Sequence, residues 1–519
     1  MRKVKVLTAE QAVELLGNGQ TLVTGGFVGN CLPEALNKAV ERQFLETGRP
    51  SDITLFYPAS QGDKSGNTGG DHYAHEGLVK RVIVGHYATA PQLGALSLAN
   101  KCEAYNLPQG ALVHLLRDMA GHRLGNITHV GLDTFVDPRN GGGKINERTK
   151  EDLVELLMID GKEQLFYKAF PVDVAFVRGS YSDEYGNISL EREVATTEVT
   201  SIAQAVKNNG GKVIVQVEKI VKAGTLNPQL VKIPGIYVHA VVVAEREDHE
   251  QSIGQPFNPA ISGLVREPAG DDVESIPLSA KKIIARRAAM ELKEDSVVNL
   301  GVGAPEYVAQ IANEEGISDF MTLTVESGVI GGIPQGGPRF GSALNPDAII
   351  DQGYQFDFYD GGGLDQAFLG LAECDEAGNI NVSRFGPKLP GCGGFINITQ
   401  NAKHVIFCGL FTAGGTKTDI VDGKLVIRQE GRNIKFIKNV EQVTFSGKYA
   451  NRTGQQVLYI TERCVFELKE DGLHLIEVAP GIDVKTQITD LMEFMPKIDE
   501  EICLMDERLF IDEKMGLGK

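Results

Sequence analysis

Cysteine is scarce in this sequence and follows no pairing pattern. The 519 residues include seven cysteines, widely scattered, with no Cys-x-x-Cys pair. An odd, scattered set predicts neither a disulfide framework nor a zinc ribbon. We expect each to be a small buried hydrophobe in a reducing compartment. The seven are Cys31, Cys102, Cys374, Cys392, Cys408, Cys464 and Cys503.

A long apolar run and an excess of positive charge are also missing. No run of 18 apolar residues occurs, and Glu10 and Glu14 interrupt the apolar stretch that a signal peptide would need. The sequence contains 69 acidic and 51 basic residues, which gives a formal net charge of −18. That balance disfavours binding to nucleic acid or to an anionic membrane. We therefore expect a cytoplasmic protein, in which an anionic ligand needs a local positive or amide-lined site.

The pattern of the remaining residues predicts an α/β protein. Short β-branched runs alternate with helical patterns, which favours layers built around parallel sheets. A chain of this length exceeds the usual limit of a single hydrophobic core, so we expect two domains. The clearest expected strands are 212–217, 241–243 and 405–408, and the clearest expected helices are 34–46 and 280–292.

An internal repeat divides the sequence into two similar halves. The pattern Asp-Glu-x-Gly-Asn-Ile at 183–188 recurs at 375–380. Upstream, a strand, a glycine turn and a Pro-Glu helix start at 24–34 recur at 299–306. Because both motifs recur in the same order, we expect two homologous domains, with extra structure in the first half at 61–146.

A polar segment containing proline and glycine, 266–272, separates the two halves. Such composition is typical of a linker between domains. We place the boundary near residue 275, so that the domains cover residues 1–275 and 276–519.

The strongest chemical signal is a glutamate at the end of an apolar strand. Residues 321–325 read as a strand, and Glu326-Ser327-Gly328 follows directly, with further glycines at 331 and 332. In a parallel α/β fold this places Glu326 at the carboxyl end of a strand, where ligand crevices form. The glycines leave room for a reacting acyl group and its oxyanion. Alternatively, Glu326 caps a helix or pairs with an arginine.

Other motifs are weaker. Glycine loops at 25–29 and 301–303 each follow a strand and precede a helix, but neither has the ending of a P-loop. Each is either a tight turn or a contact with substrate or with the other half. His72 and His75 lack the spacing and the glutamate of a zinc site, so we expect surface or loop histidines and no metal. No Gly-x-Ser-x-Gly elbow accompanies a plausible triad.

Over nearly its whole length the sequence resembles family I CoA-transferases, closest to the propionate or acetate CoA-transferase group. In that family the Glu-Ser-Gly motif holds the catalytic glutamate, which here is Glu326. The resemblance implies two homologous open α/β domains with mostly parallel sheets, the family's α and β units fused on one chain. Matching motifs stand at 25–27, 108–110, 356–363 and 391–397.

The resemblance also implies a reaction. CoA would move between acetyl-CoA or propionyl-CoA and acetate, propionate, butyrate or lactate, through a glutamyl-CoA thioester on Glu326 and with ping-pong kinetics. Gln109 and the backbone N–H of Gly393 would stabilise the oxyanion, and Gly393 and Asn397 would bind CoA. Neither a metal nor a cofactor is implied, and a homo-oligomer, dimer or tetramer, is expected. Alternatively, Gln109 is an ordinary turn residue rather than an oxyanion donor, and 391–397 is a tight turn rather than a CoA-binding stretch.

Two other functions are compatible with the same residues. An acyl-CoA hydrolase on this fold would let water intercept the glutamyl intermediate, releasing CoA without an acceptor acid. A non-catalytic CoA-binding protein would retain the fold and bind CoA without exchanging labelled acid. The intact Glu326 and both glycine loops argue against the second.

Overall fold

The computed structural model describes residues 3–268, 275–301 and 303–518. The chain forms two compact units, each containing separate stretches of sequence. Unit 1 contains Met1–Glu267, Val325–Asp357 and Ser383–Asn397, and unit 2 contains Pro268–Thr324, Phe358–Val382 and Ile398–Lys519. Part of the expected linker, 269–274, and Val302 of the second glycine loop lie outside the described residues. The domain boundary near residue 275 stays a prediction.

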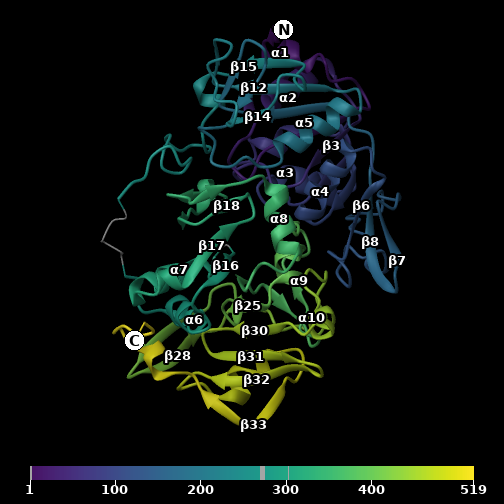
Figure 1. Ribbon diagram of the computed structural model, residues 1–519. Helices are drawn as coiled ribbons and strands as arrows, with labels where there is room; N and C mark the ends of the chain where they lie inside the picture. Colours follow the sequence, from purple (N-terminus) through teal and green to yellow (C-terminus); the bar gives the residue numbers. More distant parts are fainter. Residues whose placement is uncertain (1–2, 269–274, 302, 519) are drawn as a thin grey trace. The chain divides into compact units, whose positions relative to one another are not determined.

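Unit 1 is built on an eight-stranded sheet in which every neighbouring pair is parallel (Figure 1). Its order is β1-β15-β12-β9-β2-β3-β4-β5. The bounds are β1 Lys5–Leu7, β2 Thr21–Thr24, β3 Ile53–Tyr57, β4 Val79–Val84, β5 Glu103–Asn106, β9 Val174–Arg178, β12 Lys212–Val217 and β15 Ala240–Val243. Its helices are α1 Ala9–Val13, α2 Glu34–Thr47, α3 Pro91–Leu98, α4 Gln109–Ala120 and α5 Val199–Asn208.

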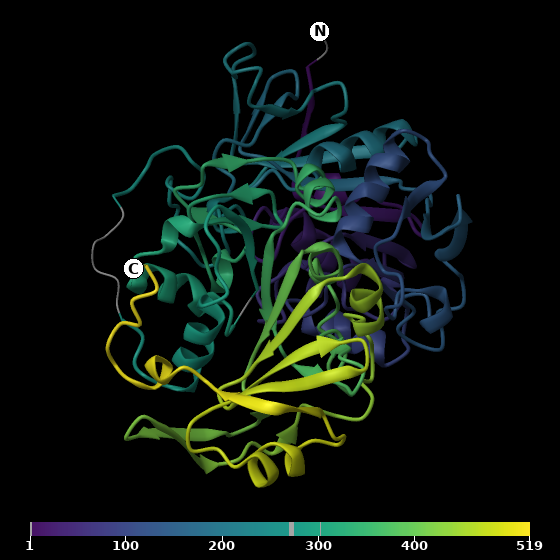
Figure 2. The same ribbon diagram turned by 60° about the horizontal axis from the view of Figure 1, so that its bottom comes forward.

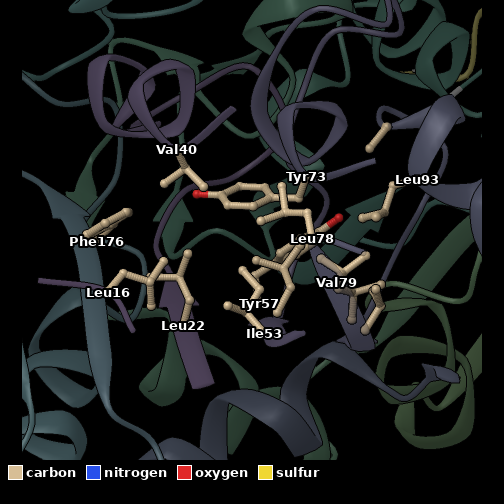
Figure 3. Packing of buried hydrophobic residues seen from close by; sticks show 14 of the residues in the cluster. Leu16, Leu22, Val40, Ile53, Tyr57, Tyr73, Leu78, Val79, Leu93 and Phe176 are labelled. Atoms are coloured by element: carbon tan, nitrogen blue, oxygen red, sulfur yellow. The ribbon is translucent and has the colours of Figure 1, made fainter. Parts of the chain in front are cut away.

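The central strands of this sheet are buried on both faces. Every residue of β9 is buried, which explains its unbroken run of apolar residues, because parallel sheets are usually covered on both sides. One face packs against α1, α2 and α3 in a cluster that includes Leu22, Ile53 and Phe176 (Figure 3). Figure 3 shows the ring of Tyr73 within this cluster, and its hydroxyl donates a 2.8 Å hydrogen bond to Oδ1 of Asn37.

Two smaller sheets complete the regular structure of residues 125–233. A three-stranded antiparallel sheet has the order β6-β8-β7, and a four-stranded sheet has the order β13-β10-β11-β14. Their bounds are β6 Gly125–Thr128, β7 Val154–Ile159, β8 Lys162–Lys168, β10 Tyr181–Asp183, β11 Ile188–Ser189, β13 Lys219–Val221 and β14 Val231–Ile233. Two later segments also belong to unit 1. Val325–Asp357 contains the antiparallel pair of β18 (Val329–Ile330) and β21 (Ala348–Ile349) and the start of α8 (Gln352–Asp360). Ser383–Asn397 contains the start of α9 (Phe395–Asn401).

Unit 2 contains eight successive strands of a second large sheet, in the order β17-β16-β22-β25-β30-β31-β32-β33. The pairs from β17 to β30 are parallel, and β30-β31-β32 are antiparallel. Figure 2 shows the long C-terminal strands of this sheet, in yellow, side by side. The bounds are β16 Ser296–Leu300, β17 Met321–Val325, β22 Gln366–Gly370, β25 His404–Cys408, β30 Gln456–Ile460, β31 Cys464–Lys469, β32 Gly472–Val478 and β33 Lys497–Leu504. Its helices include α6 Ala280–Ala289, α7 Glu306–Glu315 and α10 Gly447–Thr453.

The repeated sequence motif adopts the same turn in each unit. Asp183 Oδ1 accepts hydrogen bonds from the N–H groups of residues 185 and 187, and Asn187 donates to Asp183 Oδ2. Asp375 makes the matching set with residues 377 and 379. Each Asn also accepts an N–H from a distant glycine, Gly235 or Gly447. These hydrogen bonds explain why the motif keeps Asp and Asn at the same spacing.

The observed elements confirm the mostly parallel α/β fold. The expected strands are β12, β15 and β25, and the expected helices are α2 and α6, although α6 ends at Ala289 rather than at residue 292. All seven cysteines are free thiols, and six are buried. The expectation of burial is wrong for Cys503, which is exposed near the end of β33. No helix in the described part of the chain is long and apolar enough to cross a membrane.

Candidate active site

Glu326 is the first residue beyond β17, and its side chain is half-buried. The strand ends there because the next residues turn sharply: Gly328 has φ of +106° and its N–H donates to the Val325 carbonyl at 3.0 Å. A Cβ added at Gly328 would meet the Ile350 carbonyl at 2.1 Å, so only glycine fits. The predicted position of Glu326, at the carboxyl end of a strand, is confirmed.

The carboxylate side chain lies beside a second glycine turn. A Cβ added at Gly394 would lie 3.5 Å from Cγ of Glu326 and 3.4 Å from the ring of Phe356. Glu326 and Phe356 belong to one sequence segment and Gly394 to another, and both segments lie within unit 1. The turn at Gly394 therefore lies directly next to the side chain of Glu326, with room for no more than about one methyl group between them.

Gln109 begins α4 and is buried, with an exposed fraction of 2%. Its backbone N–H donates to the Gly393 carbonyl at 2.9 Å, which ties the start of α4 to the glycine turn. Its side-chain Nε2 is buried and has no hydrogen-bond partner among the residues that the structure describes. Buried donors are rarely left without an acceptor, so this amide is available to a ligand.

The backbone N–H of Gly393 already has a hydrogen-bond acceptor within the protein. Its N–H, which the family resemblance assigns to the oxyanion, donates a 2.7 Å hydrogen bond to the Gly85 carbonyl. An oxyanion would therefore have to share this donor with Gly85 or displace that bond. The next residue, Gly394, has no such bond to its N–H within the described ranges, and it lies nearer to Glu326.

Asn397 lies in α9, and its side chain is completely buried. Its Oδ1 accepts the backbone N–H of Gly110 at 3.1 Å. Gly110 is required there, because a Cβ on it would lie 2.3 Å from Nδ2 of Asn397. The structure thus brings Glu326, Gln109, Gly393 and Asn397 into one region of unit 1, while their roles stay predictions.

Two residues of this region have no counterpart among the sequence predictions. Asn106 ends β5, and its Nδ2 donates to the carbonyls of Val84 and Gly85 while its Oδ1 accepts the N–H of Cys392. It thereby holds the glycine turn at 391–394 against the loop after β4. His86 lies in that loop, and its Cδ2 would be 3.4 Å from a Cβ on Gly393.

The ring of His86 is electrically neutral near pH 7. Burial, and then the positive charge of Lys64, lower the pKa of His86 to about 4. Its Nδ1 is buried with no partner in the described part of the chain. Asn106 and His86 both stand at the carboxyl ends of neighbouring parallel strands, where ligand sites form. This shared position is the sequence signal that could have marked them as site residues.

The first glycine loop packs against the chain that follows Glu326. Phe27 stacks on Phe340 with ring centroids 6.0 Å apart, and Asn30 donates to the Phe340 carbonyl at 2.7 Å. Ser327 donates from its hydroxyl to the Gly341 carbonyl at 2.6 Å. Phe340 and Gly341 belong to the second half of the sequence, so within unit 1 this loop contacts residues of the other half, which is one of the alternatives considered for it.

His72 and His75 form ion pairs with Glu34 and Glu41. His72 Nε2 lies 2.8 Å from Glu34, its Nδ1 lies 2.5 Å from Glu41, and His75 lies 2.7 Å from Glu41. The expectation of a surface or loop histidine is wrong for His72, which is buried with both ring nitrogens paired. No group of three or more His, Cys, Asp or Glu side chains arranged for a metal occurs within the described ranges.

A separate pocket of about 500 Å³ opens in unit 1. It contains none of the predicted site residues, so the assignment of Glu326 does not depend on it. The residues around it include Arg178, Arg192, Arg246, His249 and Phe257.

Comparison with known proteins identifies the family. A family model described as coenzyme A transferase matches residues 6–244. Acetate CoA-transferase YdiF of Escherichia coli strain K12 is 47% identical over 515 residues, covering 99% of this chain and 96% of that protein. The chain belongs to the coenzyme A transferase family. This CoA-transferase is also 47% identical over 519 residues to caffeate CoA-transferase of Acetobacterium woodii, covering 99% and 98% of the two chains.

A solved structure shows that the CoA-transferase fold extends over nearly the whole chain. The acyl-CoA transferase YdiF of Escherichia coli O157:H7, crystallised as a thioester complex with CoA, matches with a TM-score of 0.94 and 46% identity. The match covers 99% of this CoA-transferase and 97% of that chain. The resemblance to this family is therefore confirmed.

Proposed function

We propose that this CoA-transferase exchanges CoA between acetyl-CoA or propionyl-CoA and short acids: acetate, propionate, butyrate and lactate. The observation that carries the proposal is the position of Glu326, half-buried directly after β17 and beside the glycine turn at Gly394. The names of the relatives, acetate and caffeate CoA-transferase, support the reaction class, and the thioester complex of YdiF supports a covalent intermediate.

In the first step the ionised carboxylate of Glu326 attacks the thioester carbonyl of the acyl-CoA. A C–O bond forms, the C–S bond breaks, and the products are an acyl-glutamyl anhydride and the CoA thiolate. The thiolate then attacks the glutamyl carbonyl, which releases the free acid and leaves a glutamyl-CoA thioester. A second acid repeats both steps in reverse, so the kinetics are ping-pong. These steps need neither a metal ion nor an electron carrier.

Each tetrahedral intermediate carries an oxyanion that needs hydrogen-bond donors already in place. The unpartnered Nε2 of Gln109 is one such donor. The second is the N–H of Gly393, shared with the Gly85 carbonyl, with the N–H of Gly394 next to it. Gly393 and Asn397 would also contact CoA. Asn397 additionally holds the start of α4 through Gly110.

We further infer that the enzyme acts in the cytoplasm as a homo-oligomer, a dimer or a tetramer. The acidic net charge of −18 supports partners that are small molecules rather than nucleic acid or membrane. Size-exclusion chromatography with light scattering measures the number of subunits, and a monomer at micromolar concentration would contradict the inference.

The covalent mechanism is tested by trapping. The protein is incubated with acetyl-CoA, treated with borohydride and digested, because borohydride reduces a glutamyl thioester but not a free carboxylate. We expect reduction confined to the peptide containing Glu326, dependent on acetyl-CoA and prevented by adding acetate first. Glu326→Gln should give no reduced peptide, whereas Glu46→Gln, at an exposed position on α2, should behave like the unaltered protein.

The alternatives give different results. Release of CoA without any acceptor acid, at the rate of exchange, would favour an acyl-CoA hydrolase. Folded protein that binds CoA but leaves Glu326 unmodified would overturn the transferase mechanism and favour a binding protein.

A further inference from the structure

The pocket of about 500 Å³ in unit 1 has no role in the reaction described above. Its volume lies in the range of sites that hold small organic ligands. Three arginines and three glutamates border it, and none of them belongs to the region around Glu326. A cavity on which polar groups converge, outside the active-site region, indicates a site for a second ligand.

The position of the pocket in the sheet is typical of a ligand site. Strands β2, β3, β4 and β5 follow one another toward one edge, and β9, β12 and β15 toward the other, so the strand order reverses between β2 and β9. Arg178 is the last residue of β9, and Glu218 and Ala244 directly follow β12 and β15. In open α/β sheets, ligands bind at the carboxyl ends of strands beside such a switch point. The loop of His86 follows β4, three strand spacings or roughly 14 Å from β9.

One buried group in the pocket wall lacks a hydrogen-bond partner. The side chain of His249 is 4% exposed, and its Nε2 has no partner among the described residues. The other ring nitrogen, Nδ1, lies 3.1 Å from Nε2 of Gln216. Because Oε1 of Gln216 accepts the N–H of Ala35, its Nε2 is the donor to His249. The Nδ1 of His249 is therefore an acceptor, and Nε2 carries the hydrogen of the neutral ring.

His249 and Glu193 together offer a donor beside an acceptor. The Nε2 of His249 lies 3.8 Å from Oε1 of Glu193, too far for a hydrogen bond between them. Glu193 pairs with Arg178 at 3.1 Å, but each carboxylate oxygen has two lone pairs and accepts a further hydrogen bond. Burial, and then the charges of Arg178 and Arg192, lower the pKa of His249 to about 2, so its ring is neutral near pH 7. A flat group with an acceptor next to a donor, such as the ring nitrogen and amino group of adenine, is complementary to this pair.

A flat group also has a surface to stack on in this pocket. The guanidinium of Arg192 lies over the ring of Phe257, with Cζ 3.8 Å from the ring centroid. Its Nε pairs with Glu218 at 2.9 Å, which fixes the plane of the guanidinium. Nucleobases stack on aromatic rings and on arginine guanidinium planes. The pocket therefore combines a stacking surface with the hydrogen-bonding pair of His249 and Glu193.

One positive charge at the pocket is available to an anion. Arg246 is exposed and has no ion-pair partner in the part of the chain that the structure describes. The remaining glutamate of the lining, Glu250, accepts the backbone N–H of Gly254 at 2.7 Å. An arginine at the rim of a cavity is suited to a phosphate group, because its N–H groups match the geometry of the phosphate oxygens.

We propose that this pocket binds an adenine nucleotide, at a site separate from the one where CoA is transferred. The amino group of adenine donates to Glu193, and the neighbouring ring nitrogen accepts from Nε2 of His249. The base stacks at Arg192 and Phe257, and the phosphate pairs with Arg246. Adenine nucleotides occur both free and as part of CoA, so the experiments distinguish these two sources.

Isothermal titration calorimetry of the full chain with AMP, IMP and adenosine tests the site. IMP has a carbonyl in place of the amino group, and its neighbouring nitrogen carries a hydrogen, so neither hydrogen bond to the protein forms. We expect AMP to bind about tenfold or more tightly than IMP, and more tightly than adenosine, which lacks the phosphate. No binding of AMP, or an equal Kd for either analogue, would overturn the proposal.

Variants then assign the binding to the pocket and identify the source of the nucleotide. Arg246→Ala should weaken AMP binding by about tenfold, because it removes a charged partner of the phosphate. Arg148→Ala, which alters another exposed arginine of unit 1, should bind AMP like the unaltered protein. Unchanged AMP binding in Arg246→Ala would contradict the assignment.

The Kd of CoA is measured by calorimetry on the same preparations, so the test does not depend on the proposed reaction. We expect Arg246→Ala to bind CoA with unchanged affinity, since CoA has its own site. A loss of CoA affinity equal to the loss of AMP affinity would assign the pocket to the nucleotide part of CoA and overturn the separate site.

Discussion

The backbone N–H of Gly110 donates a 3.1 Å hydrogen bond to Oδ1 of Asn397, which is 287 residues away in the sequence. This bond joins the start of α4 to α9 within unit 1. It places Gln109, the residue before Gly110, next to the glycine turn that adjoins Glu326. The geometry proposed for the oxyanion donors therefore depends on a contact that leaves no room for a side chain at position 110.

Gly110→Ala should disrupt this arrangement. The added Cβ would lie 2.3 Å from Nδ2 of Asn397 and 2.6 Å from the ring of Phe356, so both must move. We expect a loss of ~1–3 kcal/mol in the free energy of unfolding and a marked fall in kcat/KM. Gly94→Ala in α3 is the matched control, since its Cβ would make only ordinary contacts at 3.6 Å and beyond. Equal unfolding temperatures for the two variants would contradict the prediction.

Gln109→Met should separate catalysis from stability. The Nε2 of Gln109 has no partner in the described part of the chain, so its removal leaves no other group unpaired. We expect an unchanged or higher unfolding temperature together with a kcat lower by roughly 10²–10³-fold, the usual cost of losing an oxyanion donor. Steady-state kinetics and thermal unfolding of the same preparation measure both. An unaltered kcat would mean that Gln109 is only a turn residue.

His86 should make the protein sensitive to acid. Because burial, and then Lys64, hold the pKa of His86 at about 4, the unfolded chain takes up this proton first as the pH falls below its usual value near 6.5. The histidine therefore costs stability progressively between pH 6.5 and 4 and has no such effect above that range. Between pH 7 and pH 5, the unfolding temperature of His86→Asn should fall by less than that of the unaltered protein. Parallel curves would contradict this account.

His72 should act in the opposite direction. Burial alone would lower its pKa, but the hydrogen bonds and charges of Glu34 and Glu41 outweigh burial and raise it. Its stabilising contribution is complete below the unfolded pKa near 6.5 and is lost as the pH rises through the raised folded value. Thermal unfolding between pH 6 and 9 should therefore show a decline that is absent in His72→Gln. A decline of the same size in that variant would assign it to other groups.

The sequence was sufficient where the signal is local. Periodicity and glycine placement identify the strand that precedes Glu326, the buried strands β12 and β25 and the repeated Asp-Asn turn, because each depends on residues within a short stretch. The repeat also indicated two similar units, because the same turn hydrogen bonds require the same residues in both.

The remaining features depend on contacts between distant residues. Asn106 holds the turn at Cys392 from 286 residues away, and no local pattern marks an asparagine for that task. The hydrogen bond from the Gly393 N–H to the Gly85 carbonyl likewise forms only in the folded chain, so the sequence gives no sign of it. The inclusion of 325–357 and 383–397 in unit 1 follows from tertiary contacts, whereas composition shows only the polar segment at 266–272.

The duplicated turn has a consequence for stoichiometry. Two units that share the Asp-Asn turn indicate an ancestral duplication, which could have supplied one nucleophile to each half. The sequence contains Glu-Ser-Gly only once, at 326–328, and after β3, in the first half of the sequence, the chain continues with Pro58. A preparation converted fully to the glutamyl-CoA thioester should therefore carry one CoA per chain, so that bound CoA, measured against protein mass, counts the active polypeptides in any assembly.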